Sequence, residues 1–322
     1  MKRIRLELKS ITDRSYDVLV GRGILASLHS EIQRLGSFSS FGLVTDEVVR
    51  PLVAEPLQDQ LRSNSIDTTL IALPPGESAK TIGTVLDLCQ QLLVHGFDRR
   101  SLLLAVGGGV VGDITGFAAA IYMRGIPYIQ VPTTLLAQVD SSLGGKTGVD
   151  LPSGKNLLGA FHQPRLVLSD LDVLTTLSSE ARRDGFAEVI KAALIEDPEL
   201  FSMLEKEGAD LLDTGNPLLE TIIAKACEVK CRVVNRDEYE SGLRRILNFG
   251  HTLGHALEAA ANYNISHGHA VAIGMGLAVQ LSRQWAGLSE DNADRALDLI
   301  QKLGLPTDIP QNIDPETLLV PL

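Results

Sequence analysis

The stretch SLLLAVGGGVVGD, from Ser101 to Asp113, predicts a nucleotide-binding fold. Its apolar run Leu102–Val106 has the length and composition of a buried strand. The glycines Gly107 to Gly112 match the pattern G-x-G-x-x-G, and the Ala-rich segment after them favours a helix. Such glycines let backbone amides approach a pyrophosphate, and the helix N-terminus stabilises its charge. A tight strand-to-helix turn without a ligand stays open, because no acidic residue follows at the ribose-binding spacing.

Strand-like and helix-like segments alternate around this turn, which favours an α/β layer with a mostly parallel sheet. The expected strands are Ile4–Leu8, Tyr16–Val20, Phe41–Val44, Thr68–Leu73, Ser101–Val106, Tyr128–Val131 and Leu166–Leu168. The expected helices between them include Ile24–Leu35, Glu47–Ser63 and one that ends at Val94. Helical periodicity dominates after Leu177, in Ser179–Ile195, Leu218–Val234, His251–Ala261, Ala270–Ala286 and Asp291–Leu303. We therefore expect an α/β nucleotide-binding domain (residues 1–177), a mainly helical domain (residues 178–322), and ligands in the cleft between them.

The composition excludes several classes of protein. A chain of 322 residues, 44% hydrophobic and 21% charged, is typical of a folded protein with about two domains. Its net charge of −11 disfavours a nucleic-acid or membrane partner, although a small anion can still bind a locally basic pocket. The N-terminus lacks the apolar core of a signal peptide, and no apolar stretch is long enough to span a bilayer. The unpaired Cys89, Cys227 and Cys231 favour reduced thiols, so we expect a cytoplasmic protein.

A second glycine-rich segment, DSSLGGKT (Asp140–Thr147), comes close to the P-loop pattern. It carries Asp140 where that pattern requires glycine, and the residues after it indicate a hairpin or loop instead of a helix. We therefore reject an ATPase. Lys146 and Lys155 remain candidate anion ligands, because nearby glycines leave their ammonium groups accessible. Ordinary surface lysines are the open alternative.

Four of the seven histidines fall between His251 and His269. His251 and His255 are four residues apart, so they share one face of a helix. His267 follows in a short turn flanked by glycine. The spacing supports a metal site and purely structural histidines equally well. The metalloprotease pattern H-E-x-x-H is excluded, because Thr252 stands in the place of its glutamate.

A carboxylate that could join these histidines lies in GFAEVIK (Gly185–Lys191). Glu188 and Lys191 share one face of an otherwise apolar helix, and a surface ion pair is the alternative. Lys230, Arg244 and Asn248 add polar groups close in sequence to the histidines. This clustering predicts a single site.

At these residues the chain resembles the 3-dehydroquinate synthase family, over a region from about Arg5 to the C-terminus. Its shared motifs are long, which makes chance agreement improbable. They are PPGESAK (Pro74–Lys80), GGGVVGD (Gly107–Asp113), GFAAAIYMRG (Gly116–Gly125), QVPTTLLAQVDSSLGGKTGVDLPSGKNLLGAFHQP (Gln130–Pro164), AEVIK (Ala187–Lys191), GLRRILNFGHTLGHALE (Gly242–Glu258) and HGHAVAIGM (His267–Met275).

The resemblance implies a phosphorus–oxygen lyase of the shikimate pathway that converts 3-deoxy-D-arabino-heptulosonate 7-phosphate into 3-dehydroquinate and phosphate. Family members oxidise the C5 hydroxyl with bound NAD, eliminate phosphate, reduce the ketone again and close the ring by an intramolecular aldol reaction. NAD is regenerated in each turnover. The resemblance also implies a Zn²⁺ ion, which Co²⁺ can replace, and a homodimer.

The resemblance further assigns roles to individual residues. The implied metal ligands are Glu188, His251 and His267. Substrate hydroxyls and carboxylate would be contacted by Lys191, Lys230, Arg244 and Asn248. The carboxylate and phosphate regions would be shaped by Arg124, Lys146, Asn156 and His255, with His255 placed for proton relay. The NAD site would include Asp46, Glu77, Lys80, Gly108, Gly109, Asp113, Thr133, Thr134, Lys146, Lys155 and Thr176.

Three features depart from the family pattern. His269 follows His267-Gly268 where the family usually has glutamate, and Asp150 stands where asparagine is usual. Family members also continue after the position of Leu322 with an Asp-Lys-Lys segment, one of whose lysines helps to bind phosphate. Three alternatives stay open. One is another sugar-phosphate cyclase that uses sedoheptulose 7-phosphate, and a second is a polyol dehydrogenase of the related iron-type fold, against which Glu188 and the lysine-rich loop argue. The third, suggested by the Asp-Lys-Lys segment, is an inactive NAD- and metal-binding homologue without the phosphate lysine.

Overall fold

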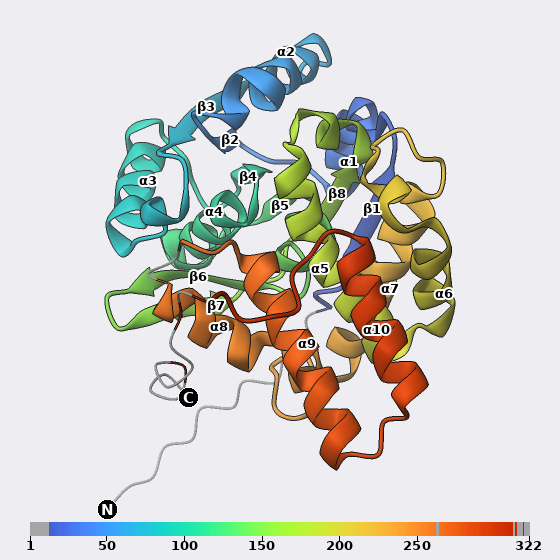
Figure 1. Ribbon diagram of the computed structural model, residues 1–322. Coiled ribbons are helices and arrows are strands. Elements are labelled where there is room, and N and C mark those ends of the chain that lie inside the picture. The colour runs from blue at the N-terminus through green and yellow to red at the C-terminus, as the bar shows by residue number, and fades with distance from the viewer. Residues whose placement is uncertain (1–12, 262–263, 312, 314–317, 319–322) are drawn as a thin grey trace, which may run out of the picture.

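The computed structural model describes residues 13–261, 264–311, 313 and 318 (Figure 1). In this part of the chain six parallel strands form one sheet, in the order β1-β8-β5-β4-β2-β3. The strands are β1 (Asp17–Gly21), β2 (Phe41–Asp46), β3 (Thr68–Leu73), β4 (Leu102–Gly107), β5 (Tyr128–Pro132) and β8 (Leu166–Asp170). The predicted parallel sheet is therefore confirmed. The strand expected at Ile4–Leu8 lies outside the described residues.

Helices cover both faces of this sheet. Helices α1 (Leu28–Leu35) and α2 (Glu55–Ser63) bury one face, and α3 (Ile82–Val94) and α4 (Gly109–Ile121) bury the other. Leu103 and Leu104 are adjacent in β4 and belong to different clusters, because successive strand residues point to opposite faces. The sheet is thus buried on both sides, which explains why its strands are continuous apolar runs.

The helix expected over Glu47–Ser63 begins later and less regularly than predicted. Residues Arg50–Ala54 form a π-helical turn, and regular α2 starts at Glu55. The carboxylate of Asp46 accepts the backbone N–H groups of Val48 and Val49, and Pro51 has no N–H to donate. These local bonds delay the start of the regular helix.

The C-terminal half is helical, as predicted. It contains α5 (Ser179–Glu196), α6 (Pro198–Glu207), α7 (Leu219–Arg236), α8 (His251–Ala260), α9 (His267–Trp285) and α10 (Glu290–Lys302). Helix α6 was not expected, although Asp197 caps its N-terminus and Pro198 occupies its first position, which is a start signal in the sequence. Helix α9 begins three residues before the expected Ala270, so His267 is its first residue and does not lie in a turn.

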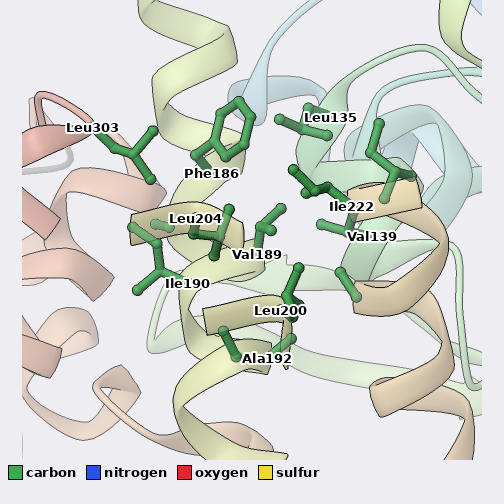
Figure 2. Close-up of a cluster of buried hydrophobic side chains, with 14 of the residues drawn as sticks. Leu135, Val139, Phe186, Val189, Ile190, Ala192, Leu200, Leu204, Ile222 and Leu303 are labelled. Carbon is green, nitrogen blue, oxygen red and sulfur yellow. The ribbon is translucent and has the colours of Figure 1, made fainter. Parts of the chain in front are cut away.

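One apolar core joins the helical half to the sheet half. Figure 2 shows Phe186 and Val189 of α5 beside Ile222 of α7, with Leu135 and Val139 from the segment after β5. The same cluster contains Val167 of β8. The division of the chain at residue 177 stays a prediction.

Strands β6 (Lys146–Leu151) and β7 (Gly154–Phe161) form an antiparallel hairpin outside the main sheet. The hairpin confirms one of the two structures expected after the glycine-rich segment. A Cβ atom on Gly159 would lie 2.1 Å from the carbonyl oxygen of Thr147, so the two strands approach more closely than a side chain permits. The backbone N–H of Asp150 donates to the carbonyl oxygen of Lys80 over 2.9 Å, which ties the hairpin to the segment after β3. Within the described residues, no helix is both long and apolar enough to cross a membrane.

Candidate active site at the carboxyl ends of the strands and the helical half

Three helices bring a carboxylate and two imidazoles together. Oε1 of Glu188 on α5 lies 3.6 Å from Nε2 of His251, the first residue of α8. The same oxygen lies 3.7 Å from Nε2 of His267, the first residue of α9. Helices α8 and α9 pack backbone to backbone, because a Cβ atom on Gly274 would lie 2.0 Å from the carbonyl oxygen of Gly250. This close packing places the two histidines beside one carboxylate.

The electrostatics of this trio, Glu188, His251 and His267, are those of a buried ligand set. Burial alone would raise the pKa of Glu188, but the Lys191 ammonium, together with His267 and His251, outweighs burial and lowers the pKa to about 2. Burial lowers the pKa of His251 to about 4. Burial would also lower the pKa of His267, but its two glutamate neighbours, Glu188 and Glu258, raise it to about 10. His267 is therefore the imidazole that gives up a proton if a metal binds.

The trio fits a divalent metal of the zinc type. Both oxygens of Glu188 are buried, and neither accepts a hydrogen bond of normal geometry from a described residue. One carboxylate and two imidazoles are ordinary zinc ligands, and three protein ligands leave a position open for substrate. Ligand atoms of a tetrahedral zinc site with bonds of about 2.1 Å lie about 3.4 Å apart, close to the separations seen here.

A buried row of charges extends from Glu188. Lys191 contacts Glu188 and lies 3.8 Å from Oδ1 of Asp140, while Nζ of Lys230 lies 2.6 Å from the same oxygen. Lys191 is 3% exposed and Lys230 is 8% exposed, which excludes the surface ion pair considered from the sequence. Burial lowers the pKa of Lys230, whereas the two carboxylates outweigh burial and raise the pKa of Lys191. In the sequence alone Asp140 is only a mismatch to the P-loop pattern, and its position beside two lysines depends on the fold.

A second group of expected substrate residues meets at Glu240, which was not predicted. Asn248 donates to Oε1 of Glu240 over 2.9 Å, and Lys146 forms an ion pair with the other oxygen. Glu240 and Asn248 line a cavity of about 930 Å³ together with Phe161 and Thr252. Arg244 is buried nearby, and its guanidinium donates to the carbonyl oxygen of Gly144 over 3.1 and 3.2 Å.

Most residues expected to bind NAD follow the carboxyl ends of parallel strands. Asp46 ends β2, Gly108 and Gly109 follow β4, Thr133 and Thr134 follow β5, and Thr176 lies on the turn after β8. In open α/β sheets ligands bind at this edge. Cβ atoms on Gly108 and Gly109 would lie 3.1 Å from Thr134 and 2.9 Å from Ser141, so glycine leaves the start of α4 as bare backbone. The hydroxyl of Thr133 is buried and has no partner among the described residues.

The remaining expected NAD residues join the β6–β7 hairpin to this edge. Nζ of Lys80 lies 2.7 Å from Oδ2 of Asp113 and donates to Oδ1 of Asn156 over 2.5 Å. Burial would lower the pKa of Lys80, but Asp113 outweighs it and raises the pKa. Nζ of Lys155 lies 3.7 Å from Oε1 of Glu77. The structure therefore groups Lys80, Asp113 and Asn156 in one cluster, with Lys155 and Glu77 as a second pair.

Glu258 on α8 is a further site residue that the sequence did not reveal. It is 2% exposed, and its Oε2 lies 3.7 Å from Nδ1 of His267. Its position three residues after His255 and seven after His251 puts it on the histidine-bearing face of the helix. That helical spacing was the signal that could have found it.

Four expected site residues are less directly connected. The ring of His255 lies 5.3 Å from that of His251, and the side chain is exposed. Arg124 is exposed on the turn after α4. In the described part of the chain, Asp46 accepts the backbone N–H groups of Val48 and Val49, and the hydroxyl of Thr176 donates to the carbonyl oxygen of Val173. Among the described residues, no hydrogen bond or ion pair joins Arg124, Asp46 or Thr176 to the trio.

Comparisons with known proteins are consistent with this arrangement. Residues 70–184 match a family described as 3-dehydroquinate synthase N-terminal, and residues 185–321 match one described as 3-dehydroquinate synthase C-terminal. A 3-dehydroquinate synthase of Pelobacter propionicus is 47% identical over 96% of this chain and 88% of the relative. One of Agrobacterium fabrum is 45% identical over 98% of this chain and 85% of the relative.

Solved structures show the same fold with ligands. ValA, a 2-epi-5-epi-valiolone synthase of Streptomyces hygroscopicus with NAD⁺ and Zn²⁺ bound, has a TM-score of 0.90 and 33% identity, covering 98% of this chain and 88% of ValA. A 2-deoxy-scyllo-inosose synthase with carbaglucose-6-phosphate, NAD⁺ and Co²⁺ has a TM-score of 0.88 and 32% identity, covering 95% of this chain and 83% of that one. A glycerol dehydrogenase of Schizosaccharomyces pombe, at 18% identity and a TM-score of 0.71, shares the fold alone; the match covers 98% of this chain and 84% of that one.

Proposed function

The chain belongs to the 3-dehydroquinate synthase family, and from this premise we propose that it converts 3-deoxy-D-arabino-heptulosonate 7-phosphate into 3-dehydroquinate and phosphate. The observation that carries the proposal is the convergence of Glu188, His251 and His267 on one buried point. It occurs in a chain whose relatives of that name are 42–47% identical over nearly its whole length. The enzyme would be a phosphorus–oxygen lyase.

Two cofactors fit the residues present. Glu188, His251 and His267 would hold Zn²⁺ or Co²⁺, and the backbone at Gly108 and Gly109 would approach the NAD pyrophosphate. When bound, NAD exchanges a hydride with C5 of the substrate and the metal lowers the pKa of the C5 hydroxyl.

The buried cations would orient the substrate. Asp140 holds Lys230, and Lys191 lies between Asp140 and Glu188, so both ammonium groups are in place before substrate arrives. Groups fixed in this way bind charged or hydroxyl groups without a further ordering cost. Arg244 would add a positive charge for the carboxylate through the N–H groups that the carbonyl oxygens of Gly144 and Glu238 do not use. The bulk charge of −11 therefore does not prevent binding of an anion.

Phosphate loss requires groups that bind the leaving anion and hold a proton. Lys146, Asn156 and Arg124 would serve the phosphate and carboxylate regions, since each offers N–H donors. Partial loss of hydration lowers the pKa of His255 below its ordinary value of 6.5, although part of the side chain stays exposed, so the neutral ring can accept a proton near pH 7. Its place one helical turn after His251 puts this base beside the metal trio, as proton relay requires.

Glu258 would orient His267. A metal-bound histidine usually donates its second ring N–H to a carboxylate or carbonyl, which sets the tautomer and the ring direction. Oε2 of Glu258 faces Nδ1 of His267, while Oε1 of Glu188 faces Nε2. The two carboxylates thus occupy opposite sides of one ring.

The test is phosphate release by purified protein supplied with NAD, Zn²⁺ and the heptulosonate 7-phosphate. We expect release of phosphate in step with 3-dehydroquinate, no net NADH, and loss of activity after thorough metal removal. Activity that survives metal removal would contradict the mechanism. Turnover of sedoheptulose 7-phosphate instead would indicate another cyclase, and net NADH formation would indicate a polyol dehydrogenase. NAD and zinc binding without phosphate release would indicate an inactive homologue.

We also propose that the protein acts as a cytoplasmic homodimer. The family resemblance supports this proposal. Sedimentation equilibrium of the purified protein checks the oligomeric state. A mass equal to one chain of 34.7 kDa would contradict the dimer.

A further inference from the structure

Asp184 on α5 reaches the first turn of α9. Its Oδ1 accepts the backbone N–H of His269 over 3.1 Å and lies 3.5 Å from Nδ1 of the same residue. Asp184 and His269 are 16% and 28% exposed, so water partly covers the pair. Asp184 stands one helical turn before Glu188, and His269 stands two residues after His267. Asp184 is therefore on the same side of α5 as Glu188, and His269 belongs to the same helical turn of α9 as His267.

The hydrogen bond from the backbone N–H of His269 to Asp184 takes the place of the usual N-cap hydrogen bond of α9. Ser266 occupies the N-cap position, but its side chain makes no hydrogen bond to the helix backbone. Its hydroxyl lies 2.7 Å from Nδ1 of His269 instead. An N-cap side chain ordinarily accepts the N–H of the second or third helical residue, and His269 is the third. A carboxylate from another helix thus supplies the cap, at the helix end where negative charge is favoured.

The backbones of the two helices also meet at this point. A Cβ atom on Gly268 would lie 2.0 Å from the carbonyl oxygen of Asp184, so the first turn of α9 rests directly on α5. The cap bond and this contact together restrict how α9 can slide or rotate against α5. The separation that they restrict is the one between Glu188 and His267, which is 3.7 Å between ligand atoms.

We propose that Asp184, acting with His269, is the positioning residue that fastens α9 to α5 and so sets the distance between Glu188 and His267. The proposal rests on the proposed function in one respect, that Glu188 and His267 are the metal ligands. A carboxylate at position 269 would face the carboxylate of Asp184, whereas the imidazole of His269 can pair with it.

The test is the zinc dissociation constant of the full chain, measured by competition with a chelator of known affinity. Asp184→Ala removes the cap, and we expect zinc to bind about tenfold more weakly. Asp184→Asn keeps an oxygen that can accept the N–H, so it should restore binding to within about threefold of wild type. Asp197→Ala is the control, because the carboxylate of Asp197 also accepts the N–H of a third helical residue, Leu200 of α6, but does so from the N-cap position of that helix. It should lower the melting temperature and leave zinc affinity unchanged.

A second comparison tests the pairing of Asp184 with His269. His269→Glu should weaken zinc binding by about tenfold, and adding Asp184→Asn to it should recover most of the loss, because like charges then no longer face each other. Wild-type zinc affinity in Asp184→Ala would overturn the proposal. If Asp184→Ala does not fold, equal zinc affinity of His269→Glu with and without Asp184→Asn would overturn it. The measurement needs no substrate, so a chain that binds zinc and releases no phosphate refutes the proposed function and leaves this inference standing.

Discussion

Nζ of Lys155 lies 2.9 Å from Oε1 of Glu258, and this ion pair joins the β6–β7 hairpin to α8. The other oxygen of Glu258 faces His267 over 3.7 Å. Burial alone would raise the pKa of Glu258, but His267 and Lys155 outweigh it and lower the pKa to about 2. One carboxylate therefore connects a residue proposed to bind NAD with a proposed metal ligand.

The first prediction concerns Glu258→Gln. The amide keeps the size of the side chain and removes the charge that holds both Lys155 and His267. We expect zinc to bind about 10- to 100-fold more weakly, the range found for partners of metal-bound histidines. Chelator competition measures the change. Glu205→Gln is the control, since Glu205 pairs with Arg295 on the surface. Equal zinc affinity in Glu258→Gln and Glu205→Gln would refute the role of Glu258.

A second prediction separates the two histidines of α8. His251→Ala removes a proposed ligand, so the purified protein should retain no zinc after dialysis. His255→Ala removes the proposed proton acceptor, so it should retain zinc and lose about 10²- to 10⁴-fold in kcat. Metal analysis and phosphate release measure the two effects. Equal zinc content in wild type and His251→Ala would contradict the ligand assignment.

Gly274→Ala tests the packing of α8 on α9. The added methyl group would lie 2.0 Å from the carbonyl oxygen of Gly250, so the helices must move apart. We expect the free energy of unfolding to fall by about 1–3 kcal/mol, with weaker zinc binding, because the histidines move with their helices. Gly83→Ala in α3 is the control. Its methyl group meets nothing nearer than 3.5 Å, and alanine is the better helix former. Equal free energies of unfolding of Gly274→Ala and Gly83→Ala, measured with urea, would contradict this prediction.

The hydrogen bonds of Asp237 lead us to expect that the free energy of unfolding depends on pH. Its carboxylate accepts the backbone N–H of Arg244 over 2.9 Å, and it also bonds Gly242 and Ser241. These bonds, that of Arg244 foremost, hold the pKa of Asp237 well below its ordinary value of 3.8. The charged form is favoured by folding, so its contribution is fully present above pH 3.8 and is lost as the pH falls toward the folded-state pKa.

Asp237→Asn is the variant that checks this contribution. It should unfold at lower urea concentration than wild type at pH 7, because an amide offers one acceptor oxygen instead of two. The difference between the two proteins should shrink at pH 3, where the wild-type carboxylate begins to lose its advantage. A difference that is the same at both pH values would show that the charge contributes nothing.

The order of strands and helices was predictable because each depends on local pattern. Strand β3 has the predicted bounds, Thr68–Leu73, since an apolar run between turn residues is a complete local signal. The start of α9 was predicted wrongly, because its cap comes from Asp184, 85 residues earlier in the chain. No local pattern contains that partner.

The sequence by itself determined the parallel α/β sheet, the helical half, the glycine turn at Gly107–Gly112 and the family to which the chain belongs. Only the tertiary structure decided which acids meet bases that are distant in the sequence. Asp140 lies 90 residues from Lys230, and Lys155 lies 103 residues from Glu258, yet each pair is in contact. The physical reason is that secondary structure follows from neighbours along the chain, whereas buried charges must find partners wherever the packing of helices places them.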